Sequence, residues 1–144
     1  MLDASGEIVG YTVGNDVSSR SIEGENALYL PQAKMYHASC ALGPWIMLRE
    51  ELPDVSDLTI SMEIQRDSVL VWSGSISTAR MRRGVEELAS YLYRALLFPA
   101  GALLMTGTGL VPPSDFTLQS GDTVAVEIEG IGKITNQALR LESR

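Results

Sequence analysis

Two pairs of short apolar segments, each pair joined by a tight turn, constrain the fold of this chain most. In the first pair, residues 59–65 alternate between apolar and polar side chains, a polar turn follows, and residues 69–76 return. In the second pair, residues 122–128 and 133–139 flank Gly130-Ile131-Gly132. Alternation with a period of two around a short turn is typical of antiparallel pairing. We therefore predict two β-hairpins.

A helical pattern separates the two hairpins. Between residues 84 and 98, apolar side chains recur at the spacing of one helix face, namely at Val85, Leu88, Leu92 and Leu96. Pro99 and Gly101 are expected to end the helix. Strands grouped before and after a single helix favour an α+β fold over alternating βαβ units. We expect a mixed β-sandwich or roll with one long outer helix, whose buried face includes Val85, Leu88 and Leu92.

Weaker patterns occupy the rest of the chain. Apolar residues at 7–13 and 102–105 predict two short strands, and residues 45–48 read as a short buried run. Residues 15–32 are polar and interrupted by glycine, asparagine and proline, so we expect an irregular segment there. A chain of 144 residues without a linker or repeat suits a single domain over residues 1–144.

The composition excludes several classes of function. The formal net charge of -7 argues against a nucleic-acid partner. No apolar run approaches the length of a membrane span, and the N-terminus lacks a signal pattern, so we expect no membrane partner. A lone cysteine cannot form an internal disulfide, which favours a reducing, cytoplasmic setting. A single histidine nearly excludes a histidine-based triad or a multi-histidine metal site.

A dense polar cluster follows the first predicted strand, with the sequence GNDVSSR at residues 14–20. A carboxylate at a strand end, here Asp16, is a suitable oxygen ligand for a hard cation. Arg20, four residues on, could clamp a substrate carboxylate. The alternative is a helix N-cap, because asparagine, aspartate and serine are all favoured there.

Two further segments could bind an anion. Lys34 lies in a locally apolar setting, where its ammonium could bind an enolate or carboxylate oxygen; the alternative is a surface lysine whose stem covers apolar neighbours. Residues 106–109, Thr-Gly-Thr-Gly, offer two hydroxyls and exposed amides that could cradle an anion; the alternative is a plain loop.

Other reactive or charged residues favour structural interpretations. His37 is predicted to be structural, and Cys40 is predicted to be a small core residue. The basic cluster before the helix, Arg80, Arg82 and Arg83, is interpreted as a solvated face or as a network paired with Glu86 and Glu87.

Taken together, the motifs follow the order of one known family. GYTVGNDVSSR at 10–20, a lysine eighteen residues after the aspartate, LGPWI at 42–46, LLMTGTG at 103–109 and GDTVAVEIEGIGKITN at 121–136 resemble the fumarylacetoacetate hydrolase superfamily, in its C-terminal catalytic region. The stretches SIEGENALYLPQAK and TGTGLVPPSDFTL are similar to its 2-keto-3-deoxy-arabinonate dehydratase branch. The resemblance covers nearly the whole chain.

The resemblance implies a role for each matched residue. Asp16 would be a metal ligand, for Mg²⁺ with Mn²⁺ or Ca²⁺ as alternatives. Lys34 would be catalytic and would also contact substrate. The other substrate-binding residues would be Ser18, Arg20, Thr106, Gly107 and Thr108. Asp16, Arg20, Lys34 and Thr108 should then converge on one cleft.

The resemblance also implies a reaction. The expected enzyme is a Mg²⁺-dependent lyase that acts on a 2-keto acid through an enolate, namely a dehydratase of 2-keto-3-deoxy sugar acids. One alternative is a C–C bond hydrolase of the same family, and another is a truncated, non-catalytic domain. The family's other two metal ligands form a Glu-x-Glu pair upstream of Leu2, which this chain lacks, so we expect an N-terminally truncated chain without tightly held metal. A homodimer is expected.

Overall fold

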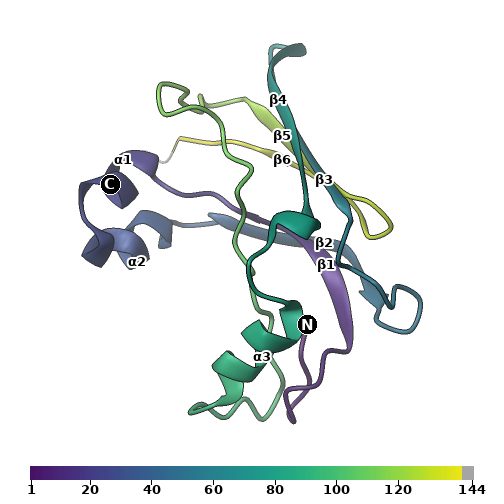
Figure 1. The fold of residues 1–144 in the computed structure, drawn as a ribbon. Helices are drawn as coiled ribbons and strands as arrows, with labels where there is room; N and C mark the ends of the chain where they lie inside the picture. The colour runs from purple at the N-terminus through teal and green to yellow at the C-terminus, as the bar shows by residue number, and fades with distance from the viewer. Residues whose placement is uncertain (141–144) are drawn as a thin grey trace.

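The computed structural model describes residues 1–140, in which six strands form two antiparallel sheets (Figure 1). The first sheet pairs β1 (Gly10–Asp16) with β2 (Cys40–Leu48). The second has the order β4-β3-β5-β6, with β3 at Thr59–Arg66, β4 at Val69–Ser77, β5 at Thr123–Ile128 and β6 at Gly132–Gln137. The helices are α1 (Arg20–Glu25), α2 (Leu30–Lys34) and α3 (Val85–Tyr93), with 3-10 turns η1 (Ala27–Tyr29) and η2 (Thr78–Arg80).

Both predicted hairpins are confirmed. β3 pairs with β4 from Thr59 opposite Ser77 onwards, and β5 pairs with β6 from Thr123 opposite Gln137. The tight turn between β5 and β6 requires positive φ at Gly130, where φ is 73° and a side chain is rarely accommodated. β3 also pairs with β5, which joins the two hairpins into one four-stranded sheet.

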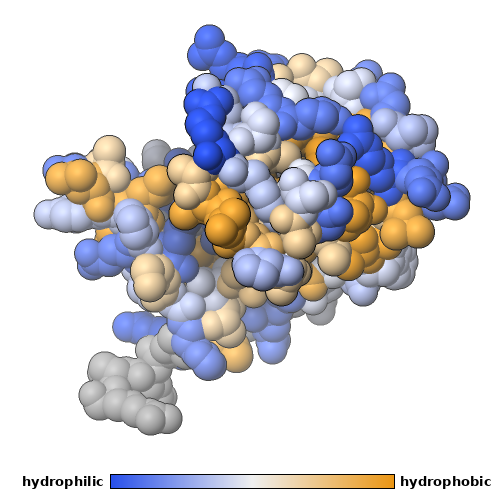
Figure 2. Space-filling model, turned by 90° about the horizontal axis from the view of Figure 1, so that it is seen from below, coloured by the Kyte–Doolittle hydropathy of each residue, from blue (hydrophilic) through white to orange (hydrophobic). Residues whose placement is uncertain are grey.

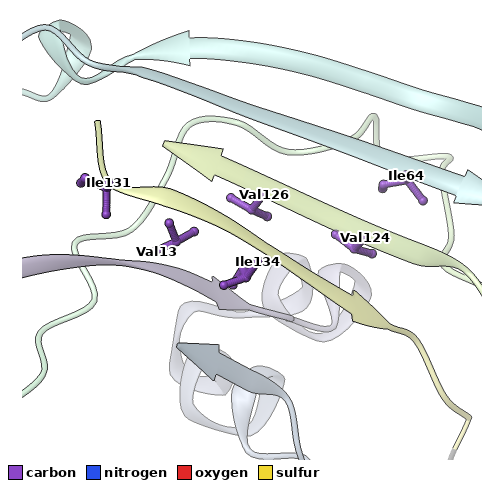
Figure 3. Close-up of a cluster of buried hydrophobic side chains, with 6 residues drawn as sticks. All are labelled: Val13, Ile64, Val124, Val126, Ile131 and Ile134. Carbon is purple, nitrogen blue, oxygen red and sulfur yellow. The ribbon is translucent and has the colours of Figure 1, made fainter. Parts of the chain in front are cut away.

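The two sheets meet in a small apolar core, which Figure 3 shows. Its buried members come from both sheets and from the β5–β6 turn: Val13, Ile64, Val124, Val126, Ile131 and Ile134. The β1–β2 ribbon supplies Val13, which is completely shielded from solvent. This packing gives the predicted α+β sandwich, with α3 outside the four-stranded sheet (Figure 1).

The helix after the first hairpin is shorter than predicted. α3 begins at Val85 and ends at Tyr93, so the expected end at Phe98 is wrong and Leu96 is exposed. The chain turns back after the helix because Ala102 exchanges two backbone hydrogen bonds with Leu2, at 2.8 and 2.9 Å. The predicted face is otherwise correct: Val85, Leu88 and Leu92 are partly buried, beside a fully buried Ala89.

Several weaker expectations were wrong. The segment expected to be irregular, residues 15–32, contains the end of β1, then α1, η1 and most of α2. The first strand lies at Gly10–Asp16 rather than 7–13, and of residues 102–105 only Ala102 forms a bridge. The apolar run at 45–48 belongs to β2 but is not buried, since Trp45 and Leu48 are 57% and 54% exposed.

The exposure of β2 has a physical reason. Alternate side chains of a strand point to opposite faces, and in the described structure the β1–β2 ribbon packs one face on the four-stranded sheet. Cys40, predicted to lie in the core, begins this strand and is exposed. Apolar side chains gather in several orange areas of the surface in Figure 2. No helix in residues 1–140 has the length and apolar character needed to cross a membrane.

The charged residues near α3 are solvent-facing, as predicted. Arg80, Arg82 and Arg83 are exposed. Glu86 does not pair with them in the described structure but with Arg49 at the end of β2, at 3.0 Å. This contact links α3 to the β1–β2 ribbon.

A buried ion pair joins the two hairpins. Asp122 is fully buried before β5 and accepts two hydrogen bonds from Arg66 at the end of β3, both 2.8 Å long, and one from the backbone N–H of Gln119 at 2.8 Å. The hydrogen bonds from Arg66 hold the pKa of the Asp122 carboxyl below its ordinary value. A two-pronged pair of this kind fixes the orientation of both groups.

We expect Asp122→Asn to lower the free energy of unfolding at neutral pH, because Arg66 and the Gln119 N–H then lose the charged acceptor of their hydrogen bonds. Since the folded pKa of Asp122 is depressed, its contribution is present above the unfolded pKa of about 3.9 and is lost as pH falls through the folded pKa. The difference between the two proteins in urea unfolding should therefore shrink below about pH 4. A difference that does not change with pH would contradict this account.

Candidate functional site

Lys34 and two polar groups at the end of β1 form the best-defined polar cluster among the residues predicted to carry chemistry. The Lys34 ammonium donates to Asp16 Oδ2 at 2.9 Å and to Ser18 Oγ at 2.6 Å. Ser18 Oγ in turn donates to the carbonyl oxygen of Asp16 at 3.1 Å. The hydroxyl therefore accepts from the ammonium and donates to the backbone, so its hydrogen-bonding capacity is well used.

The local fold explains why these groups meet. Asp16 ends β1, and Lys34 ends α2 eighteen residues later. The chain between them folds back because the backbone N–H of Ser19 donates to the carbonyl of Ala33 at 2.8 Å. Ala33 is completely buried and anchors α2 beside the strand end. Pro31 in the first turn of α2 suits a helix start, since its missing N–H would have no partner there.

The cluster remains open to solvent. The side chains of Lys34 and Asp16 are 34% and 29% exposed to solvent, respectively. An ion pair at this depth is partly screened by water, and both groups can still be reached by a small ligand. The cluster can thus present an ammonium and a carboxylate side by side to a molecule bound at the sheet edge.

Arg20 does not join this cluster in the structure. It is exposed, and its guanidinium donates to Glu23 within α1 at 2.6 Å. Its predicted contact with substrate stays a prediction.

The predicted anion cradle lies in the long segment between α3 and β5. The start of this segment passes close to β1, because a Cβ atom at Gly14 would lie 2.8 Å from Met105 Sδ. Gly107 has a positive φ of 76°, and Thr108 Oγ1 accepts from the backbone N–H of Leu110 at 2.9 Å. In the described structure, Thr106, Gly107 and Thr108 make no ion pair or side-chain hydrogen bond with Asp16 or Lys34. Their convergence on one cleft therefore stays a prediction.

The described cluster supplies part of the coordination shell that Mg²⁺ needs, namely the Asp16 carboxylate. Mg²⁺ prefers six oxygen ligands in octahedral geometry and takes one or two carboxylates plus waters or substrate. Within residues 1–140, no three His, Cys, Asp or Glu side chains gather closely enough to hold a metal ion. Asp16 is the carboxylate of the cluster, and the Lys34 ammonium already occupies one of its oxygens.

Sequence reasoning missed one contact residue of Lys34. Ser39 Oγ donates to the carbonyl of Lys34 at 2.7 Å, in the turn between α2 and β2. A serine in a polar turn has no spacing signal that could have identified this bond. His37 and Cys40, on either side of this serine, are exposed.

The fold agrees with the comparison to known proteins. Residues 2–138 match the family described as fumarylacetoacetate (FAA) hydrolase C-terminal. The chain belongs to the fumarylacetoacetate hydrolase family, which confirms the resemblance seen in its motifs.

Two curated relatives are sugar-acid dehydratases by name. A probable 2-keto-3-deoxyxylonate dehydratase of Haloferax volcanii is 52% identical over 131 residues, which cover 91% of this chain and 45% of the relative. The 2-dehydro-3-deoxy-D-arabinonate dehydratase of Saccharolobus solfataricus is 42% identical over 134 residues, which cover 93% and 45% respectively. The chain thus spans about half the length of these relatives.

A solved structure shows the same fold. It is a 2-keto-3-deoxy-D-arabinonate dehydratase complexed with magnesium and 2,5-dioxopentanoate, with a TM-score of 0.94 and 40% sequence identity. The similarity covers 99% of this chain and 50% of that one. The α+β fold predicted for the chain is therefore confirmed by an independent structure.

The strength of the Lys34–Asp16 pair can be measured with a double-mutant cycle. We expect Lys34→Met and Asp16→Asn to show a coupling energy of about 0.5–1 kcal/mol in urea unfolding, as is usual for partly exposed pairs. The more exposed Arg49–Glu86 pair, at 40% and 63%, is the matched control and should couple more weakly. Additive effects at Lys34 and Asp16 would show that the pair does not form in solution.

Proposed function

We propose that this chain contributes part of the active site of a lyase that dehydrates a 2-keto-3-deoxy sugar acid. The observation that carries the proposal is the Lys34 ammonium, held between Asp16 and Ser18 and open to solvent at the end of β1. The names of the two curated dehydratases and the 2,5-dioxopentanoate in the solved relative support this choice of substrate class.

The proposed reaction removes one water from the substrate. A base takes a proton from C3, beside the keto group, and the electron pair forms an enolate whose oxygen carries negative charge. The hydroxyl on C4 then leaves with a proton as water, which gives a 2-keto acid with a C3=C4 double bond. A proton then moves from C5 to C3, and the resulting C4=C5 enol tautomerises to a keto-aldehyde. The Lys34 ammonium would stabilise the developing enolate charge, because a fixed cation lowers the free energy of a transition state in which negative charge appears.

The other predicted contacts concern substrate binding. Ser18 would orient the Lys34 ammonium and contact substrate. Arg20 would have to leave Glu23 in order to pair with a substrate carboxylate. The hydroxyls and amides of residues 106–108 would hold the carboxylate or keto oxygen. These roles rest on the family resemblance.

We infer that the whole enzyme uses Mg²⁺, as the magnesium in the solved relative supports. Asp16 would be one ligand, and further ligands would have to come from outside the described residues, from substrate or from another chain. Mn²⁺ and Ca²⁺ as alternatives, a homodimer and a cytoplasmic location all stay predictions.

A C–C bond hydrolase is the second candidate. A relative from Burkholderia cenocepacia, 34% identical over 131 residues, is named a putative hydrolase. Both reactions start from the same kind of enolate, so the Lys34 cluster is compatible with either.

A turnover assay distinguishes the candidates. We expect the whole enzyme to which this chain contributes, supplied with Mg²⁺, to convert 2-keto-3-deoxy-D-arabinonate to 2,5-dioxopentanoate, a conversion that NMR can follow. Lys34→Met should lower kcat about 100-fold, since it removes the charge-stabilising group. Lys133→Met is the matched control, because Lys133 is a surface lysine on β6 that only approaches Glu127 at 3.8 Å.

Each other result has a distinct meaning. Pyruvate release from an acylpyruvate, without dehydration, would establish the hydrolase instead. Absence of both reactions would support a non-catalytic chain. A Lys34→Met enzyme as active as the Lys133→Met control would remove Lys34 from the mechanism.

Metal binding gives a separate test. Because Asp16 is the cluster's one carboxylate, we expect calorimetric titration of Mg²⁺ into the chain to show binding weaker than micromolar. Oxalate, which mimics the two oxygens of an enolised 2-keto acid, should tighten binding by adding ligands, and Asp16→Asn should abolish this gain. Micromolar binding without any added acid would show that the chain holds a complete metal site.

A further inference from the structure

We propose that Ser39 is a positioning residue that holds the Lys34 ammonium between its two partners. The proposal rests on the function proposed above for Lys34. Ser39 lies in the turn that leads from α2 into β2 and is half-buried. It contacts the backbone of Lys34 and the backbone beside Asp16, but neither of the charged groups themselves.

The side chain of Ser39 binds the end of α2. Its Oγ lies 2.7 Å from the carbonyl oxygen of Lys34 and 2.9 Å from that of Tyr36, so its single proton is shared between them or alternates. The last carbonyls of a helix have no partner within the helix. The hydroxyl therefore supplies a donor where α2 lacks one and fixes the backbone from which the Lys34 side chain extends.

The main chain of Ser39 binds the end of β1. Its carbonyl oxygen accepts from the backbone N–H of Val17 at 2.8 Å. Val17 lies between Asp16 and Ser18, the two residues whose oxygens accept from the Lys34 ammonium. One residue thus holds both the backbone of the donor and the backbone between its two acceptors.

Other contacts should hold α2 in place when the Ser39 hydroxyl is absent. The Ser19 N–H still donates to Ala33, and the Ala33 side chain remains buried. Loss of the hydroxyl should therefore loosen the last turn of α2, including Lys34, without detaching the helix. A shift of the ammonium relative to substrate by a fraction of an ångström is enough to slow an enzyme.

The test compares Ser39→Val with Ser39→Thr, two side chains of the same shape of which only threonine keeps a hydroxyl. Ser90→Ala is the matched control, because Ser90 Oγ also donates to a helix carbonyl, that of Glu87 at 2.8 Å, but in α3 and away from Lys34. The first readout is the side-chain ammonium resonance of Lys34 in ¹⁵N NMR spectra, since a hydrogen-bonded ammonium exchanges its protons slowly with water. The second readout is dehydratase kinetics.

We expect Ser39→Val to lose the slowly exchanging Lys34 resonance and to lower kcat about tenfold with little change in KM. Ser39→Thr and Ser90→Ala should keep both. A Ser39→Val protein that keeps the Lys34 resonance, or that loses stability as Ser90→Ala does without further effect, would overturn the proposal. Loss of the resonance in a chain whose parent has no dehydratase activity would leave Ser39 as the positioning residue and would refute the proposed function alone.

Discussion

Val13 is the buried side chain through which the β1–β2 ribbon joins the apolar core that it shares with the four-stranded sheet. It is completely shielded from solvent and shares a buried cluster with residues of β3, β5 and β6. Side chains alternate along a strand, so burying Val13 determines which faces of β1 the following residues occupy. Asp16 lies three positions further on, at the strand end. The apolar contact between the sheets thereby places the polar cluster at the edge of the sandwich, where a ligand can reach it.

The polar cluster itself is built from short pieces that depend on one another. α1 and α2 contain six and five residues, too few for either helix to be stable alone. Their positions come from the burial of Ala33 and from backbone hydrogen bonds of Ser19 and Ser39. The orientation of Lys34 thus depends on tertiary contacts more than on helix propensity. This explains how a solvent-accessible ammonium can still have a defined place.

The sequence patterns predicted the parts of the fold that local periodicity determines. Both hairpins were found because a period of two around a short turn, polar in the first and glycine-containing in the second, is visible within a few residues. The α1–α2 region was not, since helices of five or six residues leave no periodic signal and Pro31 read as a break. The length of α3 was overestimated because Leu96 continued the apolar spacing. The chain instead turns away after the helix to pair Ala102 with Leu2, a contact between residues far apart in the sequence.

In the candidate site too, local sequence was informative and contacts between distant residues were not predicted. Asp16 and Lys34 were identified by resemblance, and their separation of eighteen residues in sequence says nothing of a direct ion pair, which appears only when α2 folds back. Cys40 and Trp45 were expected inside because apolar residues usually are. Whether a strand's second face is covered depends on neighbours in space, and sequence periodicity cannot report that.

The two tryptophans of the chain differ in solvent exposure, so their fluorescence reports on different parts of the molecule. Trp45 on β2, whose indole lies beside Gly132, is more than half exposed, whereas Trp72 on β4 is partly buried against the core. An indole in water emits at longer wavelength than one in an apolar environment and is more accessible to a dissolved quencher such as iodide. The fluorescence of the chain therefore separates into a component from the ribbon surface and a component from the sandwich interior. Events at the ribbon and loss of the core can be followed independently, without any added label.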